Sequence, residues 1–201
     1  MILFWIVVAS YLIGSIPFSY LASKIKGQDP RKAGTGNVGA TNTLIVAGKR
    51  AGIIALVGDV GKGFLAITLA RYFQLPDWGI ALAALAVVVG HDFSVFLKFK
   101  GGKGVATTGG ILFALDPIFT ILVILFWILS MLLVRHFIPG TALTFIMIPV
   151  LMWMVSWRPE YIAFGVVNAA LGLYSHRASL ERFYQGTEPT IQESIAKYLN
   201  K

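Results

Sequence analysis

Cysteine is absent from the 201-residue chain, and charged residues are scarce at 13%. The missing cysteines exclude disulfides, cysteine-ligated zinc and thiol nucleophiles. A soluble domain carries about 25% charged residues, whereas here the shortage of charge accompanies a hydrophobic content of 57%. Apolar residues also run in long stretches, such as residues 1–12 and 117–134. The composition therefore predicts a single integral-membrane domain over residues 1–201.

The chain also lacks the features of a secretory leader. No basic segment precedes the first apolar run, and no small-residue cleavage site follows it cleanly. We therefore expect this run to be retained as the first membrane helix. The formal charge of +8 is interpreted as an excess of cations in cytoplasmic loops, and not as a sign of nucleic-acid binding.

Seven apolar segments are candidates for membrane helices. They cover residues 2–22, 51–72, 78–90, 105–115, 117–134, 137–156 and 160–174. Two of them, 78–90 and 105–115, are shorter than the roughly 20 residues that cross a bilayer. Short segments beside a polar stretch predict broken helices or a re-entrant loop. The sequence thus predicts an all-α polytopic membrane protein in which some helices are short or broken.

The number of spans depends on Asp116-Pro117. One continuous helix over 105–134 gives six spans, whereas a turn at Asp116 gives seven. With seven spans and the amino end outside, 14 of the 17 cations fall in the inner loops, as the positive-inside rule requires. The six-span alternative moves the C-terminal cations outside. We therefore predict about seven spans, with the N-terminus outside and the C-terminus in the cytoplasm.

A short amphipathic helix is predicted at residues 190–200. Thr190 and Glu193 have the spacing of a capping box, and apolar side chains recur at i, i+4, i+7 and i+8 from Ile191. Such a helix would lie on the inner face of the membrane. A frayed polar tail is the alternative.

Residues 33–42 form the first of three polar segments that the seven-span arrangement places on the cytoplasmic side. Their sequence is Ala-Gly-Thr-Gly-Asn-Val-Gly-Ala-Thr-Asn, and glycine lets a backbone approach a ligand closely. Asn37, Thr41 and Asn42 offer hydrogen bonds to an oxyanion or a hydroxyl. The chain has no Walker A sequence. We predict a ligand-binding segment, and an ordinary flexible loop is the alternative.

The second polar segment, residues 99–107, reads Phe-Lys-Gly-Gly-Lys-Gly-Val-Ala-Thr. Lys100 and Lys103 flank two glycines, and an apolar helix is expected to begin directly afterwards. Backbone N–H groups at a helix start favour an anion, so we predict a phosphate site here. A loop that is basic only because it is cytoplasmic is the alternative. His91, which ends the preceding span, is more typical of a structural hydrogen bond than of a base.

The third polar segment, residues 175–189, begins at the inner end of the last span. His176 and Arg177 are adjacent there and are interpreted as an anion clamp, with Ser179 close by. Arg182 is either part of the site or part of a solvated helix face.

Two charged residues, Asp59 and Lys62, fall inside the second predicted span. Their i, i+3 spacing puts them on one helix face. Charges at this depth usually pair and line a cavity. We predict that they belong to a functional site, and a purely structural ion pair is the alternative.

Taken together, these motifs resemble those of the acyl-phosphate:glycerol-3-phosphate acyltransferase family, often called PlsY. The matching segments, in order and spacing, are residues 14–17, 34–42, 90–91, 96–107, 175–177, 180–182 and 186–188. The resemblance covers essentially the whole chain. It implies transfer of an acyl group from acyl phosphate to the 1-hydroxyl of sn-glycerol 3-phosphate, the first step of bacterial phospholipid synthesis. The products would be 1-acylglycerol 3-phosphate (lysophosphatidate) and phosphate, made at the cytoplasmic face of the inner membrane.

The resemblance also implies roles for individual residues. Substrate-phosphate contacts are expected from Gly39, Thr41, Asn42, Gly102, Lys103, Gly104, His176 and Arg177. The catalytic candidates are Asn37, Lys103 and His176. Apart from the resemblance, the secondary candidates are Asp59, Lys62, His91, Lys100, Thr107 and Ser179. No metal or cofactor is expected. The expected partners are glycerol 3-phosphate, acyl phosphate and membrane lipids without nucleic acid, and a monomer is compatible with the sequence.

The mechanism is less constrained by the sequence. No His-x-x-x-x-Asp pair occurs, and no Ser/His/Asp order stands out. Because acyl phosphate is already activated, we predict catalysis by positioning and charge stabilisation. A phosphate oxygen of a substrate would then take the hydroxyl proton, and His176 as a general base is the alternative.

Two other functions compete with an enzyme: a membrane transporter of phosphate or organophosphate, and a binding or scaffold protein. A transporter is expected to have paired repeats and a site reached from both faces. The polar motifs of this chain are predicted to lie on one face, which favours the enzyme.

Overall fold

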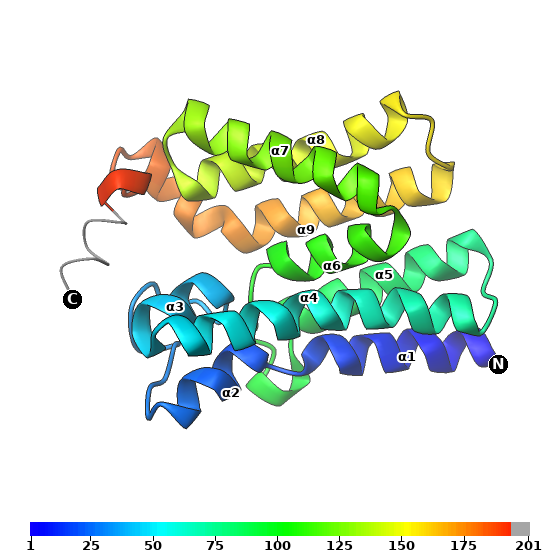
Figure 1. Ribbon diagram of the computed structural model, residues 1–201, viewed down its shortest axis with the longest axis horizontal. Helices are drawn as coiled ribbons and strands as arrows, with labels where there is room; N and C mark the ends of the chain where they lie inside the picture. Colours follow the sequence, from blue (N-terminus) through cyan, green and yellow to red (C-terminus); the bar gives the residue numbers. More distant parts are fainter. Residues whose placement is uncertain (194–201) are drawn as a thin grey trace. The chain divides into compact units, whose positions relative to one another are not determined.

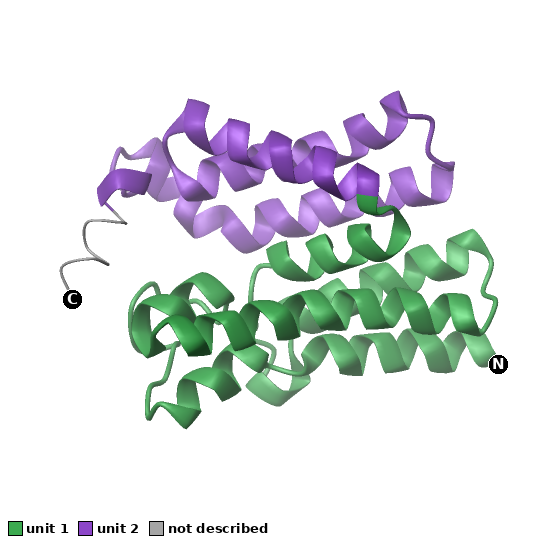
Figure 2. Ribbon diagram, in the orientation of Figure 1, with its two compact units in different colours: residues 1–117 green, residues 118–201 purple. Residues whose placement is uncertain are grey.

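The computed structural model describes residues 1–193, and within that range the chain is helical without any strand. The prediction of an all-α fold is confirmed. The chain forms two compact units, residues 1–117 and residues from 118 onward, which Figure 2 colours separately. The single-domain assignment over 1–201 stays a prediction.

Five helical segments of the described chain are long and apolar enough to cross a membrane. They are Ile2–Ile25, Lys49–Tyr72, Asp77–Leu97, Pro117–Val134 and Phe137–Met154. The helix Val105–Leu115 is apolar but shorter, as predicted. The other segment that was predicted to be short, residues 78–90, is longer than predicted. The helix begins at Asp77 and ends at Asp92. The number of spans and their orientation stay predictions.

Unit 1 contains six α-helices and one 3₁₀ turn (Figure 1). They are α1 (Ile2–Ser15), α2 (Phe18–Ile25), α3 (Ala40–Ala47), α4 (Lys49–Tyr72), α5 (Asp77–Asp92), η1 (Val95–Leu97) and α6 (Val105–Leu115). Helix α1 packs on α5, and α4 packs on α6.

Glycine allows these two helix pairs to approach closely. A Cβ on Gly14 would lie 2.2 Å from the carbonyl oxygen of Val87, and one on Gly90 would lie 2.1 Å from that of Tyr11. Gly63 and Gly110 meet the facing backbone in the same way between α4 and α6. Small residues at such crossings are how membrane helices gain contact area.

Proline breaks the first predicted span. Instead of one helix over 2–22, the chain forms α1 and α2, which are separated by Ile16 and Pro17. Proline lacks a backbone N–H and disfavours a helical residue before it. The break leaves backbone carbonyls of α1 without a partner within the helix, and one of them takes part in the site described below.

Unit 2 contains α7, α8 (Phe137–Met154) and α9 (Pro159–Tyr184). Helix α7 is Pro117–Val134. The predicted turn before it is confirmed, because α6 ends at Leu115 and Asp116 is extended. Proline suits the first turn of α7, where its missing N–H has no cost.

Helix α9 is longer than the predicted segment 160–174. It continues to Tyr184, so the third polar segment begins as a helix and not as a loop. Within unit 2, α8 and α9 pack where the ring of Phe145 lies 2.8 Å from the place a Cβ on Gly172 would occupy. Helices α7 and α8 are joined by the hydroxyl of Ser130, which donates to the carbonyl of Gly140 at 2.9 Å.

The capping box at Thr190 is confirmed, but most of the helix predicted at 190–200 lies outside the described residues. The Thr190 N–H donates to Glu193 Oε2 at 2.7 Å, and the Glu193 N–H donates to Thr190 Oγ1 at 3.2 Å. The Thr190 N–H lowers the pKa of the Glu193 carboxyl from its usual value, because it hydrogen-bonds the charged form.

Candidate functional site

The glycine–lysine loop, residues 98–104, lies against the end of α5. The N–H of Gly101 donates to the carbonyl of Asp92 at 2.9 Å, and the N–H of Gly102 donates to that of His91 at 3.0 Å. Carbonyls in the last turn of a helix have no partner within it. The loop therefore caps α5 through its backbone.

Glycine is required in this loop because α5 is so close. A Cβ on Gly101 would lie 1.9 Å from the carbonyl oxygen of His91, and one on Gly102 would lie 2.1 Å from His91 Nε2. Gly104 has φ +72°, in the left-handed region that glycine adopts without strain. The predicted close approach of the glycine backbone is thus, in this structure, an approach to α5.

The loop ends where α6 begins. Gly104 is the N-cap and Val105 the first helical residue, so the predicted helix start is confirmed. Lys103 is half-buried directly before it, and Lys100 is exposed. The N–H groups of the first helical turn carry partial positive charge, and a lysine beside them suits a phosphate. Thr107 is fully buried in that turn, and the described residues provide no hydrogen-bond partner for its Oγ1.

In the segment 33–42, Asn42 organises the backbone. Its Oδ1 accepts the N–H of Thr35 at 2.8 Å, and its Nδ2 lies 2.8, 3.1 and 2.9 Å from the carbonyls of Pro30, Ala33 and Asn37. The side chain is only 1% exposed. These contacts give Asn42 a role in shaping the loop. Its predicted contact with phosphate stays a prediction.

The other candidates of this segment are more accessible. Gly39 is the N-cap of α3, Asn37 and Gly39 are half-buried, and Thr41 is exposed. A Cβ on Gly39 would lie 2.8 Å from Asn37 Nδ2, so the Asn37 amide lies beside the start of α3. The helix itself was not predicted, because its eight residues were assigned to a polar loop.

The first and second polar segments meet in unit 1, which agrees with the prediction that they lie on one side. A Cβ on Gly102 would lie 2.8 Å from the carbonyl oxygen of Val38. Val38, Gly101 and Gly102 also line one cavity with Asp59 and His91. The cavity volume is about 10 Å³, enough for about one water molecule.

The predicted pairing of the two membrane charges is confirmed. Lys62 Nζ lies 3.0 Å from Asp59 Oδ1, and both residues are buried. Sequence reasoning missed two of their partners. Ser19 Oγ donates to Asp59 Oδ2 at 3.1 Å, and Lys62 Nζ donates to the carbonyl of Ile16 at 3.2 Å. The only signal for them was the Gly-Ser-Ile-Pro motif at 14–17, which breaks the helix there.

In unit 2, His176 is a buried residue of α9. Its side chain is 1% exposed and packs on Phe145, with 5.9 Å between the ring centroids. Its Nδ1 lies 2.7 Å from the carbonyl of Gly172. Because a carbonyl only accepts, Nδ1 is the protonated nitrogen in this contact. Nε2 is therefore the ring nitrogen that suits a role as proton acceptor.

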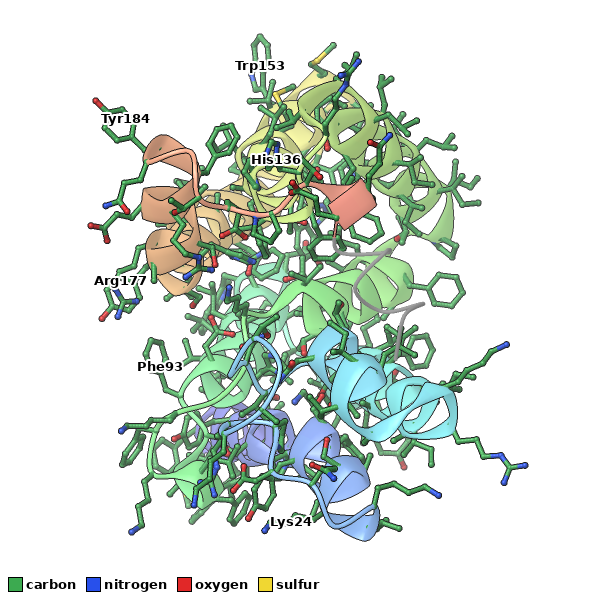
Figure 3. The ribbon with its side chains drawn as sticks, turned by 90° about the vertical axis from the view of Figure 1, so that its left-hand side faces the viewer. Lys24, Phe93, His136, Trp153, Arg177 and Tyr184 are labelled. Atoms are coloured by element: carbon green, nitrogen blue, oxygen red, sulfur yellow. The ribbon has the colours of Figure 1, made fainter. Side chains whose placement is uncertain are left out.

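The anion clamp predicted from His176 and Arg177 stays a prediction, and the two side chains leave α9 in different directions. Consecutive helical residues are about 100° apart. Arg177 is exposed on α9 (Figure 3), whereas His176 is buried. The Arg177 guanidinium lies 4.0 Å from the centroid of the Tyr174 ring and donates to the Tyr174 carbonyl. Separate contacts of either residue with phosphate stay predictions.

Ser179 lies in a short chain of contacts at the end of α9. Its Oγ accepts from Arg182 Nη2 at 2.8 Å, and Arg182 Nε lies 2.8 Å from Glu188 Oε2. Gly186, at φ +69°, turns the chain between them. Arg182 is exposed, as a solvated helix face requires, and it also ties α9 to the segment that follows. Within residues 1–193, no three His, Cys, Asp or Glu side chains gather as metal ligands.

Comparison with known proteins gives one consistent result. Residues 4–186 match the family model for glycerol-3-phosphate acyltransferase. The curated protein of that name from Geotalea daltonii is 36% identical to this chain, over 91% of this chain and 94% of the relative. The one from Bordetella pertussis is 41% identical, over 92% of this chain and 90% of the relative.

Solved structures agree with this family match. The chain resembles the crystal structure of PlsY (YgiH), an integral membrane glycerol 3-phosphate acyltransferase, in its glycerol 3-phosphate form. The TM-score is 0.89 at 33% identity, and the match covers 95% of this chain and 96% of the other. The lysophosphatidic acid form matches with a TM-score of 0.88 at 33% identity, over 94% and 95%.

Proposed function

The chain belongs to the glycerol-3-phosphate acyltransferase family of integral membrane enzymes, and from this premise we propose that its acyl donor is acyl phosphate. The acyl group is transferred to the 1-hydroxyl of sn-glycerol 3-phosphate. The products are 1-acylglycerol 3-phosphate and inorganic phosphate. The enzyme works in the bacterial inner membrane with its site facing the cytoplasm.

The glycine–lysine loop is the observation that carries this proposal. It combines the N-terminal N–H groups of α6 with Lys103, and its backbone is fixed to α5 by two hydrogen bonds of 2.9 and 3.0 Å. Donors that are already fixed in place bind an anion without first being ordered, which favours both affinity and charge stabilisation in the transition state. Both proposed substrates carry phosphate, so one such site serves this chemistry directly.

The reaction balances without a cofactor. The oxygen of the 1-hydroxyl forms a bond to the acyl carbonyl carbon, and the bond from that carbon to the phosphate oxygen breaks. The phosphate leaves with the electron pair, and negative charge builds on the carbonyl oxygen and the leaving group. Lys103 and the N–H groups at the start of α6 stabilise charge of this kind.

The hydroxyl proton goes to a phosphate oxygen of a substrate. This assignment follows from the donor, because phosphate is a good leaving group and the attack does not require a strongly basic side chain. The alternative acceptor is His176 Nε2, because Nδ1 donates to the carbonyl of Gly172. Asn37 and Thr41, at the accessible start of α3, supply neutral hydrogen bonds to glycerol 3-phosphate in this scheme.

The donor is tested with the purified protein and labelled glycerol 3-phosphate. Equal concentrations of acyl phosphate, acyl-CoA and acyl-carrier protein with the same acyl chain are offered separately. We expect lysophosphatidate to form only with acyl phosphate, with one phosphate released per product. Efficient turnover with acyl-CoA and none with acyl phosphate would show that the proposed donor is wrong.

A further inference from the structure

Four segments of unit 1 meet at the buried carboxylate of Asp59. Lys62 on α4 pairs with it at 3.0 Å, and Ser19 on α2 donates to it at 3.1 Å. Lys62 also holds the carbonyl of Ile16 at the break between α1 and α2. The fourth segment is the end of α5, where His91 Nδ1 lies 3.6 Å from Asp59 Oδ1. This Asp59 network therefore connects the helix break, α4 and α5.

The His91 ring lies between this network and the glycine–lysine loop. On one edge Nδ1 faces Asp59 Oδ1 at 3.6 Å, close enough for electrostatic attraction but longer than a hydrogen bond. On the other edge Nε2 lies 2.1 Å from the place a Cβ on Gly102 would occupy. Since a carbon–carbon bond in the backbone is about 1.5 Å long, the ring nitrogen is within roughly 3.6 Å of Gly102 Cα.

His91 contacts Gly102 a second time through its own backbone. Its carbonyl accepts the N–H of Gly102 at 3.0 Å. Gly102 is thus held by both the ring and the carbonyl of one residue, and Lys103 is the next residue in the chain. If the His91 ring rotates, its contact with Gly102 changes.

The network itself has no room for a substrate. The cavity that Asp59, His91 and Gly102 line is about 10 Å³, roughly the space of one water molecule. Glycerol 3-phosphate is several times larger. The contact of His91 with Gly102 gives Asp59 and His91 a route to the substrate through the loop.

We propose that Asp59 and His91 are positioning residues for phosphate binding. Asp59 orients the His91 ring, and the ring supports Gly102 so that Lys103 and the start of α6 present their donors together. The proposal rests on the proposed function, in which the glycine–lysine loop binds substrate phosphate. A purely structural role is the rival, in which the network only holds the helices together.

Two substitutions of His91 separate these roles. In His91→Asn the amide stands near the former Nδ1 and keeps a donor towards Asp59, but the side chain no longer reaches Gly102. In His91→Gln the amide stands near the former Nε2 and reaches Gly102, but the contact with Asp59 is lost. A purely structural network predicts that the Asn variant behaves as the parent, because the buried carboxylate keeps its partner.

The measurement is the affinity for glycerol 3-phosphate, by calorimetry on the detergent-purified protein without acyl donor, together with its unfolding temperature. We expect both variants to bind about 10- to 100-fold more weakly, as small misplacements of positioning groups do. We also expect the Asn variant to unfold within a few degrees of the parent. The matched control is His136→Asn, which replaces a half-buried histidine of unit 2. The affinity of this variant for glycerol 3-phosphate should not change.

An Asn variant that is folded and binds glycerol 3-phosphate as the parent does would overturn the proposal. Lys103→Ala distinguishes this failure from a failure of the proposed function. If Lys103→Ala weakens binding of glycerol 3-phosphate, the loop binds substrate and only the positioning role is rejected. If both His91 variants fail to fold, Ser19→Ala removes one hydrogen bond to Asp59 and leaves the charges paired. That variant should bind about two- to tenfold more weakly, and an unchanged affinity would equally reject the positioning role.

Discussion

Replacing Gly101 by alanine should remove most of the enzyme's activity while leaving the protein folded. The added Cβ would lie 1.9 Å from the carbonyl oxygen of His91 and 2.8 Å from that of Asp92. Both neighbours are backbone atoms at the end of a helix, and neither can rotate away as a side chain could. The loop must therefore move away from α5.

The size of the movement follows from the contact distances. Ordinary contact begins at 3.4 Å, so the loop and α5 must separate by roughly 1.5 Å. A shift of that size breaks the hydrogen bonds from Gly101 and Gly102 to α5, each worth about 0.5–1.5 kcal/mol. The expected cost in stability is therefore about 1–3 kcal/mol. Misplacement of a positioning group by about 1 Å can lower the rate by about 100-fold.

The assay is kcat/KM for lysophosphatidate formation, paired with the unfolding temperature in detergent. We expect kcat/KM to fall by about 100-fold in Gly101→Ala. The matched control is Gly109→Ala. Gly109 lies in α6, the helix that follows the loop, and a Cβ there meets no atom within 4 Å. Alanine suits a helix interior better than glycine by about 1 kcal/mol, so the control should keep full activity. Gly101→Ala with a rate within twofold of the parent would refute the close approach as a functional requirement.

Three further predictions test the site and the topology. Lys103→Ala should weaken glycerol 3-phosphate binding by roughly 10- to 150-fold, since a charge-assisted hydrogen bond is worth about 1.5–3 kcal/mol, whereas Lys98→Ala, which alters an exposed residue, should change calorimetric affinity little. His176→Gln should raise KM more than it lowers kcat; a loss of about 10²–10⁴-fold confined to kcat would instead identify a general base. Single cysteines at positions 28, 100 and 187 should react with an impermeant thiol reagent from the cytoplasmic side only, and those at 77 and 158 from outside only, whereas labelling of 100 and 187 from opposite faces would contradict the seven-span arrangement. Position 100 is chosen over its neighbour 101 because it is exposed and a side chain there does not collide with α5.

Several features of the fold could be predicted because local chemistry decides them. The break at Asp116 follows from the proline after it, and the start of α6 follows from a glycine run that precedes an apolar stretch. The pairing of Asp59 with Lys62 follows from their spacing and from the cost of an isolated charge in an apolar region. Each of these depends on residues that are close together in the sequence.

The features that were missed depend on contacts between distant parts of the chain. The role of Asn42 in shaping its loop was missed, because its partners lie up to 12 residues away in the sequence. The role of Gly101 in capping α5 requires the loop to fold back on a helix that ends at Asp92. The length of α9 was underestimated because polarity was interpreted as a loop, whereas a helix can continue beyond its apolar part. Composition alone does not indicate which of these contacts form.

The buried charges of unit 1 are better explained by positioning than by stability. Removing two charges from water costs several kcal/mol per ion, and the attraction between them often does no more than offset that cost. An apolar pair at Asp59 and Lys62 could pack α4 against its neighbours without this penalty. What an apolar pair could not supply is a fixed acceptor for Ser19 and a charged neighbour for the His91 ring, which meets Gly102 on its other edge. A charge network that adds little to stability but orients a ring under the glycine–lysine loop is the arrangement expected if the network serves binding.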